Sequence, residues 1–167
     1  MEVILLMAMT LDGKIARNSR QLVDWTGKAD KQYFVRVTRK AGVVIMGSRT
    51  FDTIGKPLAG RKNIVMTRDP NRKSQEENLI FTDQSAGEII RGLEKEGFEA
   101  VTLIGGAIVN SLFAKENLIT QIHVTLVPVL FGQGLSLFKD SLDLKLELAE
   151  NREIDKGHLL LVYRVIP

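Results

Sequence analysis

The chain has 167 residues, of which 44% are apolar, and it carries a net charge of +3 with an isoelectric point near 9.2. A chain of this length and apolar content is expected to form one domain over residues 1–167. It contains no cysteine and only two histidines, His123 and His158, which are far apart in sequence. Disulfides and thiolate metal ligands are therefore excluded, and we expect no metal site.

The basic residues are interspersed with acids and form no long run, which favours a small anionic ligand over nucleic acid. Residues 1–9 are apolar but lack a basic leader, so they predict a strand and not a signal peptide. No apolar run approaches the ~20 residues of a membrane span. We expect a cytoplasmic protein with a small-molecule substrate and no membrane partner. A monomer and a homodimer both stay open, because the apolar segment 127–138 suits either a sheet edge or a dimer contact.

Apolar patterns predict strands and helices that alternate along most of the chain, which is typical of an α/β fold. The predicted strands are residues 3–9, 43–46, 63–67, 79–82, 101–104, 122–129, 144–152 and 158–165. The predicted helices are residues 30–40, 50–54, 85–96 and 107–113. No helix separates the last three strands. We therefore expect a central, mostly parallel sheet with flanking helices that ends in an antiparallel C-terminal hairpin.

Two local features refine this prediction. Residues 10–27 form a long polar stretch, and a loop of this length inside a domain is more often functional than idle. The helix at 85–96 has a clear start, because Ser85 suits the N-cap position and Glu88 completes a capping box.

A phosphate site is predicted where the first central strand ends at Gly47. Glycine lets the backbone turn closely, and a short helix follows around Thr50. Free backbone N–H groups and the positive end of the helix dipole therefore meet at this point, with Ser48 and Arg49 as further donors. The neighbouring strand delivers Arg68 to the same edge of the sheet.

Generic nucleotide and hydrolase motifs are absent. Gly132-Gln133-Gly134 lacks a third glycine at the required offset, and Gly55-Lys56 runs into Pro57, so neither a dinucleotide fingerprint nor a P-loop is present. Neither histidine lies near a serine elbow, which argues against a Ser-His-Asp arrangement.

Several stretches of the sequence are informative together. They read AMTLDGKI at 8–15, MGSRTF at 46–51, IGKPLAGRKNIV at 54–65 and IGGA at 104–107. In addition, Trp25 is followed by Asp30 and Phe34 in a W-x4-D-x3-F spacing. As a set they resemble the dihydrofolate reductase family and cover most of the chain up to about residue 125. The resemblance implies a three-layer α/β fold and the reduction of 7,8-dihydrofolate by hydride transfer from NADPH.

The resemblance also implies roles for the matching residues. Asp30 and Trp25 are the expected catalytic residues, and Asp30 would bind the 2-amino-4-oxo edge of a pterin. The expected substrate-binding residues are Met7, Ala8, Asp30, Phe34, Ile54, Arg61 and Thr125. The expected NADPH-binding residues are Ala8, Ile15, Gly47, Ser48, Arg49, Thr50, Met66, Thr67, Arg68, Ile104, Gly105, Gly106, Ala107, Ile108 and Val109. The candidates for the 2′-phosphate contact are Arg49, Thr67 and Arg68.

For each of these residues, the sequence also fits a purely structural role. Asp30 also suits a helix N-terminus, and Thr125 suits an ordinary strand position. Gly105-Gly106 fits a plain strand-to-helix turn, and Ile15 fits core packing. Arg61 also suits a solvated surface. In the family the matching arginine clamps the glutamate carboxylate of folate, a bidentate contact that lysine makes poorly.

Two departures from the dihydrofolate reductase pattern concern the cofactor preference and the substrate. Ser48 stands where an arginine usually follows the glycine, which weakens the expected preference for NADPH. The segments LDGKIA at 11–16 and PVLFGQGLSLF at 128–138 resemble the reductase domain of riboflavin biosynthesis, which shares the fold and the nicotinamide cofactor but reduces a phosphorylated ribosyl-aminopyrimidine. The cations that suit such a phosphate are Lys14, Arg17 and Arg20. A nucleotide-binding module without turnover is a third hypothesis.

Overall fold

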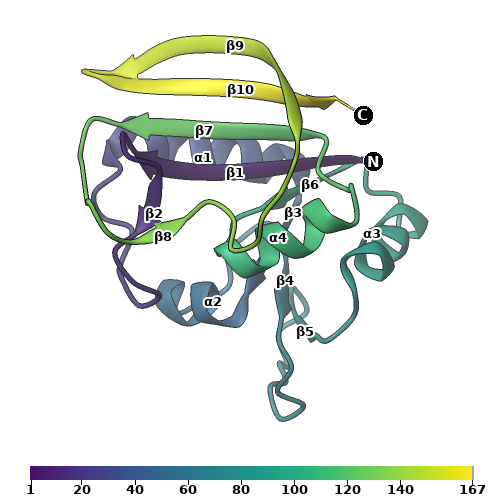
Figure 1. The fold of residues 1–167 in the computed structure, drawn as a ribbon. Coiled ribbons are helices and arrows are strands. Elements are labelled where there is room, and N and C mark those ends of the chain that lie inside the picture. The colour runs from purple at the N-terminus through teal and green to yellow at the C-terminus, as the bar shows by residue number, and fades with distance from the viewer. Residues whose placement is uncertain (167) are drawn as a thin grey trace.

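An eight-stranded sheet runs through the centre of the molecule, in the order β5-β4-β3-β6-β1-β7-β10-β9 (Figure 1). The structure is a computed structural model that describes residues 1–166. The strands of the sheet are β1 (Glu2–Thr10), β3 (Val43–Gly47), β4 (Lys62–Met66), β5 (Leu79–Thr82), β6 (Ala100–Leu103), β7 (Gln121–Val127), β9 (Lys145–Asp155) and β10 (His158–Ile166). All neighbours from β5 to β7 are parallel, whereas β10 is antiparallel to both β7 and β9. The predicted fold class is confirmed.

The helices of the described chain lie on both faces of this sheet. They are α1 (Gly27–Ala41), α2 (Ser48–Ile54), α3 (Ala86–Lys95) and α4 (Ala107–Lys115). The predicted capping box of α3 is present, since Ser85 and Glu88 each accept a hydrogen bond from the other's backbone N–H. None of the helices within residues 1–166 has the length and apolar content that crossing a bilayer requires.

Alternation along the central strands divides the core into two layers. Ile45 of β3 packs in one layer with Leu93 of α3 and Phe113 of α4. Its neighbour Met46 faces the other layer, against which Phe34 of α1 packs. In Figure 1, α1 accordingly lies behind β1 and β7, while α4 lies in front of the sheet.

The predicted strands and helices all occur, with ends that agree to within three residues. The predicted loop at 10–27 is wrong in one part, because β2 (Lys14–Ala16) pairs there with β8 (Leu135–Ser136) as a separate two-stranded sheet. Strands of three and two residues are too short to show a hydrophobic period. Their pairing also joins segments that are far apart in sequence.

Asn63 of β4 fixes the turn that connects α2 to β4. Its side chain is fully buried, and its Nδ2 donates to the carbonyl oxygens of Leu58, Arg61 and Asn78 at 3.0, 2.8 and 3.2 Å. Its Oδ1 accepts from the Leu58 N–H at 2.8 Å. One side chain therefore bonds to four backbone groups, of which only the Asn78 carbonyl also accepts a hydrogen bond from the Asn63 N–H, at 2.7 Å.

We predict that Asn63→Leu lowers the free energy of unfolding by at least about 2 kcal/mol, because buried backbone groups lose their partners. Urea unfolding would measure this loss. Asn71→Leu, at an exposed position in the following loop, should stay within about 0.5 kcal/mol of the original chain. Equal losses in the two variants would contradict the role assigned to Asn63.

Candidate active site

A cleft of about 1230 Å³ opens at the carboxyl ends of the parallel strands. Residues at the ends of β1, β3 and β4 line it, together with α1, α2 and the start of α4. Residues of β2 and β8 form a further wall. Open α/β sheets bind their ligands at this edge.

Most of the predicted site residues line this cleft. Those of the substrate set are Met7, Ala8, Asp30, Phe34 and Ile54. Those of the cofactor set are Ala8, Ile15, Gly47, Ser48, Arg49, Thr50, Met66, Thr67, Arg68, Ile104, Gly106, Ala107, Ile108 and Val109. Four residues expected from the dihydrofolate reductase resemblance do not line it, namely Trp25, Arg61, Gly105 and Thr125. The three cations expected for the phosphate of a ribosyl-aminopyrimidine, Lys14, Arg17 and Arg20, do not line it either. The individual roles stay predictions.

Asp30 lies in the first turn of α1, half-buried at the wall of the cleft. Phe34 follows one helical turn later, and Ile54 and Leu58 add apolar surface from α2 and the turn after it. Within residues 1–166, no hydrogen bond or ion pair engages the Asp30 carboxylate. A free carboxylate beside an apolar wall suits the N–H-bearing edge of a flat heterocycle, because two parallel charge-assisted hydrogen bonds can form.

Three buried polar atoms lie in the segments next to Asp30 and Ala8. Trp25 Nε1, Thr26 Oγ1 and Thr125 Oγ1 have no hydrogen-bond partner in the described part of the chain. Thr26 lines the cleft, and Thr125 is the register partner of Ala8, which also lines it. An unpaired buried polar group costs free energy, so its presence points to a function for the group.

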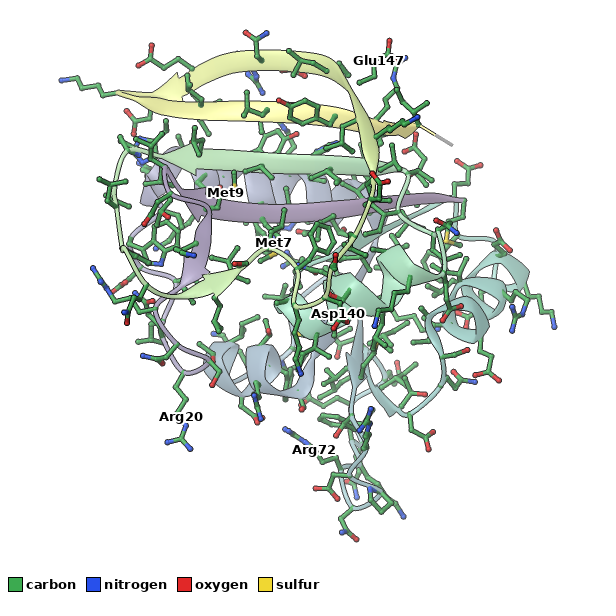
Figure 2. The ribbon with its side chains drawn as sticks, viewed as in Figure 1. Met7, Met9, Arg20, Arg72, Asp140 and Glu147 are labelled. Atoms are coloured by element: carbon green, nitrogen blue, oxygen red, sulfur yellow. The ribbon has the colours of Figure 1, made fainter. Side chains whose placement is uncertain are left out.

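Two helices begin at another part of the cleft wall. α2 starts directly after Gly47 and α4 directly after Gly106, so both present free backbone N–H groups there. The Gly47 N–H donates to the Gly105 carbonyl at 2.9 Å, which holds the two strand ends together. Gly105 has a φ of 93°, and a Cβ there would lie 3.1 Å from Cε of Met7, which Figure 2 shows beside β1. Glycine is therefore required at this position.

Arg49 and Arg68 make the surroundings of these helix starts positive. Both side chains are exposed and line the cleft, and neither forms an ion pair within residues 1–166. Free guanidinium groups beside helix N-termini are suited to phosphate groups.

Arg61 is placed differently from the expected carboxylate clamp. Its side chain is only 8% exposed, its Nη1 donates to Thr38 Oγ1 at 2.8 Å and its Nε donates to the Ala59 carbonyl at 3.1 Å. Burial, and then the charge of Arg39, lowers the pKa of this guanidinium. Its contacts tie α1 to the turn before β4.

The loop after β1 is held against the loop after β7. Both oxygens of Asp12 accept backbone hydrogen bonds, from Phe131 at 3.2 Å and from Gly132 at 2.6 Å. The Phe131 ring lies edge-on to Trp25, with 5.0 Å between ring centroids, and the Arg17 guanidinium lies 4.1 Å from its centroid. These contacts position the β2–β8 wall of the cleft.

The sequence reasoning missed several residues that line the cleft, among them Thr26, Lys31, Leu58 and Ser136. Thr26 precedes α1 and would be interpreted as a capping residue, yet its hydroxyl makes no cap hydrogen bond. Lys31 directly follows Asp30 in the W-x4-D-x3-F spacing, and Leu58 lies inside the stretch IGKPLAGRKNIV at 54–65, so both could have been found from the motifs. Ser136 had no signal, because β8 was not predicted.

Comparison with known proteins identifies the family. The model of the dihydrofolate reductase family matches residues 2–156. A protein of Caenorhabditis elegans that is provisionally named a dihydrofolate reductase is 33% identical over 162 residues, which is 90% of this chain and 84% of that protein. The chain belongs to the dihydrofolate reductase family. The dihydrofolate reductase of Haemophilus influenzae is 35% identical over 104 residues, or 61% of this chain and 58% of that enzyme.

Solved structures with the same fold widen the comparison for this dihydrofolate reductase family member. A Shewanella protein provisionally assigned to riboflavin biosynthesis superposes over the whole of both chains with a TM-score of 0.85 and 23% identity. RibD of Acinetobacter baumannii gives a TM-score of 0.84 and 19% identity, over 99% of this chain and 58% of that one. These two structures show that the fold is shared, and the family match over residues 2–156 supports an oxidoreductase.

We predict that Asp12→Asn loosens the loop at 128–134. The Thr10 hydroxyl and then the Phe131 and Gly132 N–H groups lower the pKa of Asp12 to about 2. Because this pKa lies below the ordinary value of 3.8, the ionised carboxylate stabilises the folded loop above about pH 4, and the effect is lost as the pH falls through about 2. Hydrogen exchange at neutral pH should therefore be faster in the variant.

Two controls accompany this measurement. Asp24→Asn changes an exposed acid in the connection from β2 to α1 and should leave exchange at 128–134 unchanged. In the original chain, the protection of the amides at 128–134, corrected for intrinsic exchange, should stay constant from about pH 5 to about pH 8. Asp12 is fully ionised throughout that range. Protection that weakens within that range would contradict the assigned role.

Proposed function

We propose that this family member reduces 7,8-dihydrofolate to tetrahydrofolate with NADPH. The observation that carries the proposal is the position of Asp30. Its carboxylate lines the cleft without a partner in the described chain, beside Phe34, in a cleft that also contains two helix N-termini. The W-x4-D-x3-F spacing thus places an acid and an aromatic ring on one wall.

The cofactor-binding part of the proposal rests on Gly47, Gly106 and the two arginines. The pyrophosphate would be held by the backbone N–H groups that start α2 and α4. Arg49 and Arg68 are suited to a 2′-phosphate, a charge-assisted contact of roughly 1.5–3 kcal/mol. Bound NADPH supplies the hydride for the reaction.

The substrate-binding part assigns orientation to Asp30. Its two oxygens would accept hydrogen bonds from the 2-amino group and N3 of the pterin, which fixes the ring in the cleft. Reduction then adds a hydride at C6 and a proton from solvent at N5. Phe34, Ile54 and Leu58 would cover the ring and limit access of water to it.

A phosphorylated ribosyl-aminopyrimidine is a second candidate substrate, favoured by the positions of two cations. Arg61 bonds to Thr38 and does not line the cleft, so it is not displayed as a carboxylate clamp there. Lys31 is exposed, lines the cleft and directly follows Asp30, where it is suited to an anionic group of the substrate.

We predict that Asp30→Asn lowers kcat/KM by about 10²-fold or more, because the variant loses the carboxylate that fixes the pterin ring in the cleft. The assay is NADPH oxidation, followed by absorbance, with dihydrofolate and separately with the phosphorylated ribosyl-aminopyrimidine. Asp24→Asn, outside the cleft, is the matched control and should keep full activity.

The two substrates separate the candidate functions. Turnover of dihydrofolate that collapses in Asp30→Asn supports the proposal, whereas turnover of the ribosyl-pyrimidine alone transfers the assignment to the second candidate. If NADPH binds but neither substrate is reduced, both assignments fail.

We also predict that Thr26→Val raises the substrate KM without lowering the free energy of unfolding. Its buried hydroxyl has no partner in the described chain, so its removal relieves a cost of about 1–3 kcal/mol in the free protein and removes a group that substrate can pair with. The matched control is Thr102→Val, because the Thr102 hydroxyl is equally buried but donates to the Val43 carbonyl at 3.1 Å. That control should lose stability and keep its KM, and the reverse pattern would refute the role of Thr26.

A further inference from the structure

The connection from β4 to β5, residues 67–78, is tied to α2 by one ion pair. Nη1 and Nη2 of Arg72 donate to the two carboxylate oxygens of Asp52, at 3.1 and 2.5 Å. Within the described chain, no other hydrogen bond or ion pair joins this connection to α2. Figure 2 shows Arg72 on the side of the connection toward α2. A bidentate pair fixes the direction of both side chains as well as their distance.

Two aromatic rings also lie beside the Arg72 guanidinium. Its central carbon is 4.9 Å from the ring centroid of Phe81 in β5 and 5.8 Å from that of Phe51 in α2. The two rings are perpendicular to each other, with 5.5 Å between their centroids. The hydrogen bond to Arg72 lowers the pKa of Asp52, and the same bond raises the pKa of Arg72, so both groups are ionised at neutral pH. Arg72 therefore joins its own connection to both α2 and β5.

Arg68 lies inside a turn that Arg72 closes. Before it, the Thr67 N–H donates to the Thr82 carbonyl at the end of β5, at 2.8 Å. After it, the Asp69 N–H donates to Thr67 Oγ1 at 3.2 Å, and the Arg72 N–H donates to the Asp69 carbonyl at 3.3 Å. The backbone of Arg68 is therefore held on both sides, to the sheet through Thr67 and to α2 through Arg72.

The same ion pair relates Arg68 to Arg49. Arg49 and Asp52 lie three positions apart on α2, and residues at that spacing are neighbours on one face of a helix. Arg49 and Arg68 line the cleft, whereas Arg72 and Asp52 do not. The Arg72–Asp52 pair thus lies outside the cleft and connects the two segments that bring free cations into it.

We propose that Arg72 is a positioning residue that makes the cofactor site selective for a 2′-phosphate. The proposal rests on the NADPH-dependent reduction proposed above. While Arg72 is bound to Asp52, Arg49 and Arg68 are held in place before the cofactor arrives, so a phosphate that contacts them need not order the connection on binding. A ribose without the 2′-phosphate gains nothing from this arrangement, because it brings no charge for the guanidinium groups.

Replacing Asp52 separates positioning from simple charge. Asp52→Asn removes a negative charge near the site, which by electrostatics alone would strengthen phosphate binding. It would also release Arg72 as a third cation. Positioning requires the opposite result, since the released connection no longer holds Arg68 and the phosphate must order it. The sign of the change therefore decides between the two explanations.

Titration calorimetry with two nucleotides tests the proposal. The probes are adenosine 2′,5′-bisphosphate and adenosine 5′-monophosphate, which lacks the 2′-phosphate. The original chain should bind the bisphosphate about 10- to 100-fold more tightly, as expected for a charge-assisted contact. Asp52→Asn and Arg72→Gln should each reduce this preference about 5-fold or more, with little change for the monophosphate. Asp52→Glu keeps the carboxylate and should retain most of the preference.

Two exposed residues of the same connection provide charge-matched controls. Glu77→Gln and Lys73→Gln remove the same charges as Asp52→Asn and Arg72→Gln, and both should keep the preference of the original chain. Asp52 and Arg72 are 55% and 25% exposed, so their variants should fold, which circular dichroism checks.

Unchanged or tighter bisphosphate binding in Asp52→Asn would overturn the proposal, and so would an equal loss for both nucleotides. Equal binding of the two nucleotides by the original chain would overturn it together with the NADPH assignment. No folate or pyrimidine takes part in these titrations, so a failure of either substrate assignment does not alter their outcome.

Discussion

The hydrogen bond from the Gly47 N–H to the Gly105 carbonyl is the contact on which the cleft depends. It joins the ends of β3 and β6, so α2 and α4 begin close to the same point. Neither strand end tolerates a larger residue without displacing a neighbour: a Cβ at Gly47 would lie 3.2 Å from Val109, and one at Gly105 would lie 3.1 Å from Met7. The N-termini of α2 and α4 therefore lie close together because the backbones at Gly47 and Gly105 pack closely.

A different constraint governs the wall of the cleft between α1 and β4. Asn63 satisfies the backbone of the preceding turn, and Arg61 bonds from that turn to Thr38 in α1. Asn63 and Arg61 therefore stabilise the wall of the cleft that contains Asp30 and Phe34. From the sequence motif alone, Arg61 would be assigned to ligand binding and Asn63 to an ordinary strand position. The bond from Arg61 to Thr38 is a structural contact. Arg61 could also bind a substrate carboxylate only if its guanidinium group reached the substrate as well.

The sequence predicted the parts of this arrangement that depend on short-range patterns. The apolar run ending at Gly47 and the spacing from Trp25 to Phe34 located the central strand and one wall of the cleft. The burial of Arg61 was not predictable, because it depends on Thr38, which is remote in sequence. The β2–β8 pair was missed for a similar reason, and the hydroxyl of Thr26 was missed because its residue type favours capping.

The β2–β8 pair has a consequence for how molecules enter and leave. It forms a sheet of its own, tied to β1 by the hydrogen bond from the Lys14 N–H to Thr10 Oγ1 at 2.9 Å, and it supplies Ile15, Ala16, Leu135 and Ser136 to the cleft. Asp12 bonds join its two connecting loops. The two loops are therefore joined into one unit, so chain segments more than one hundred residues apart together form the wall that a bound molecule must pass.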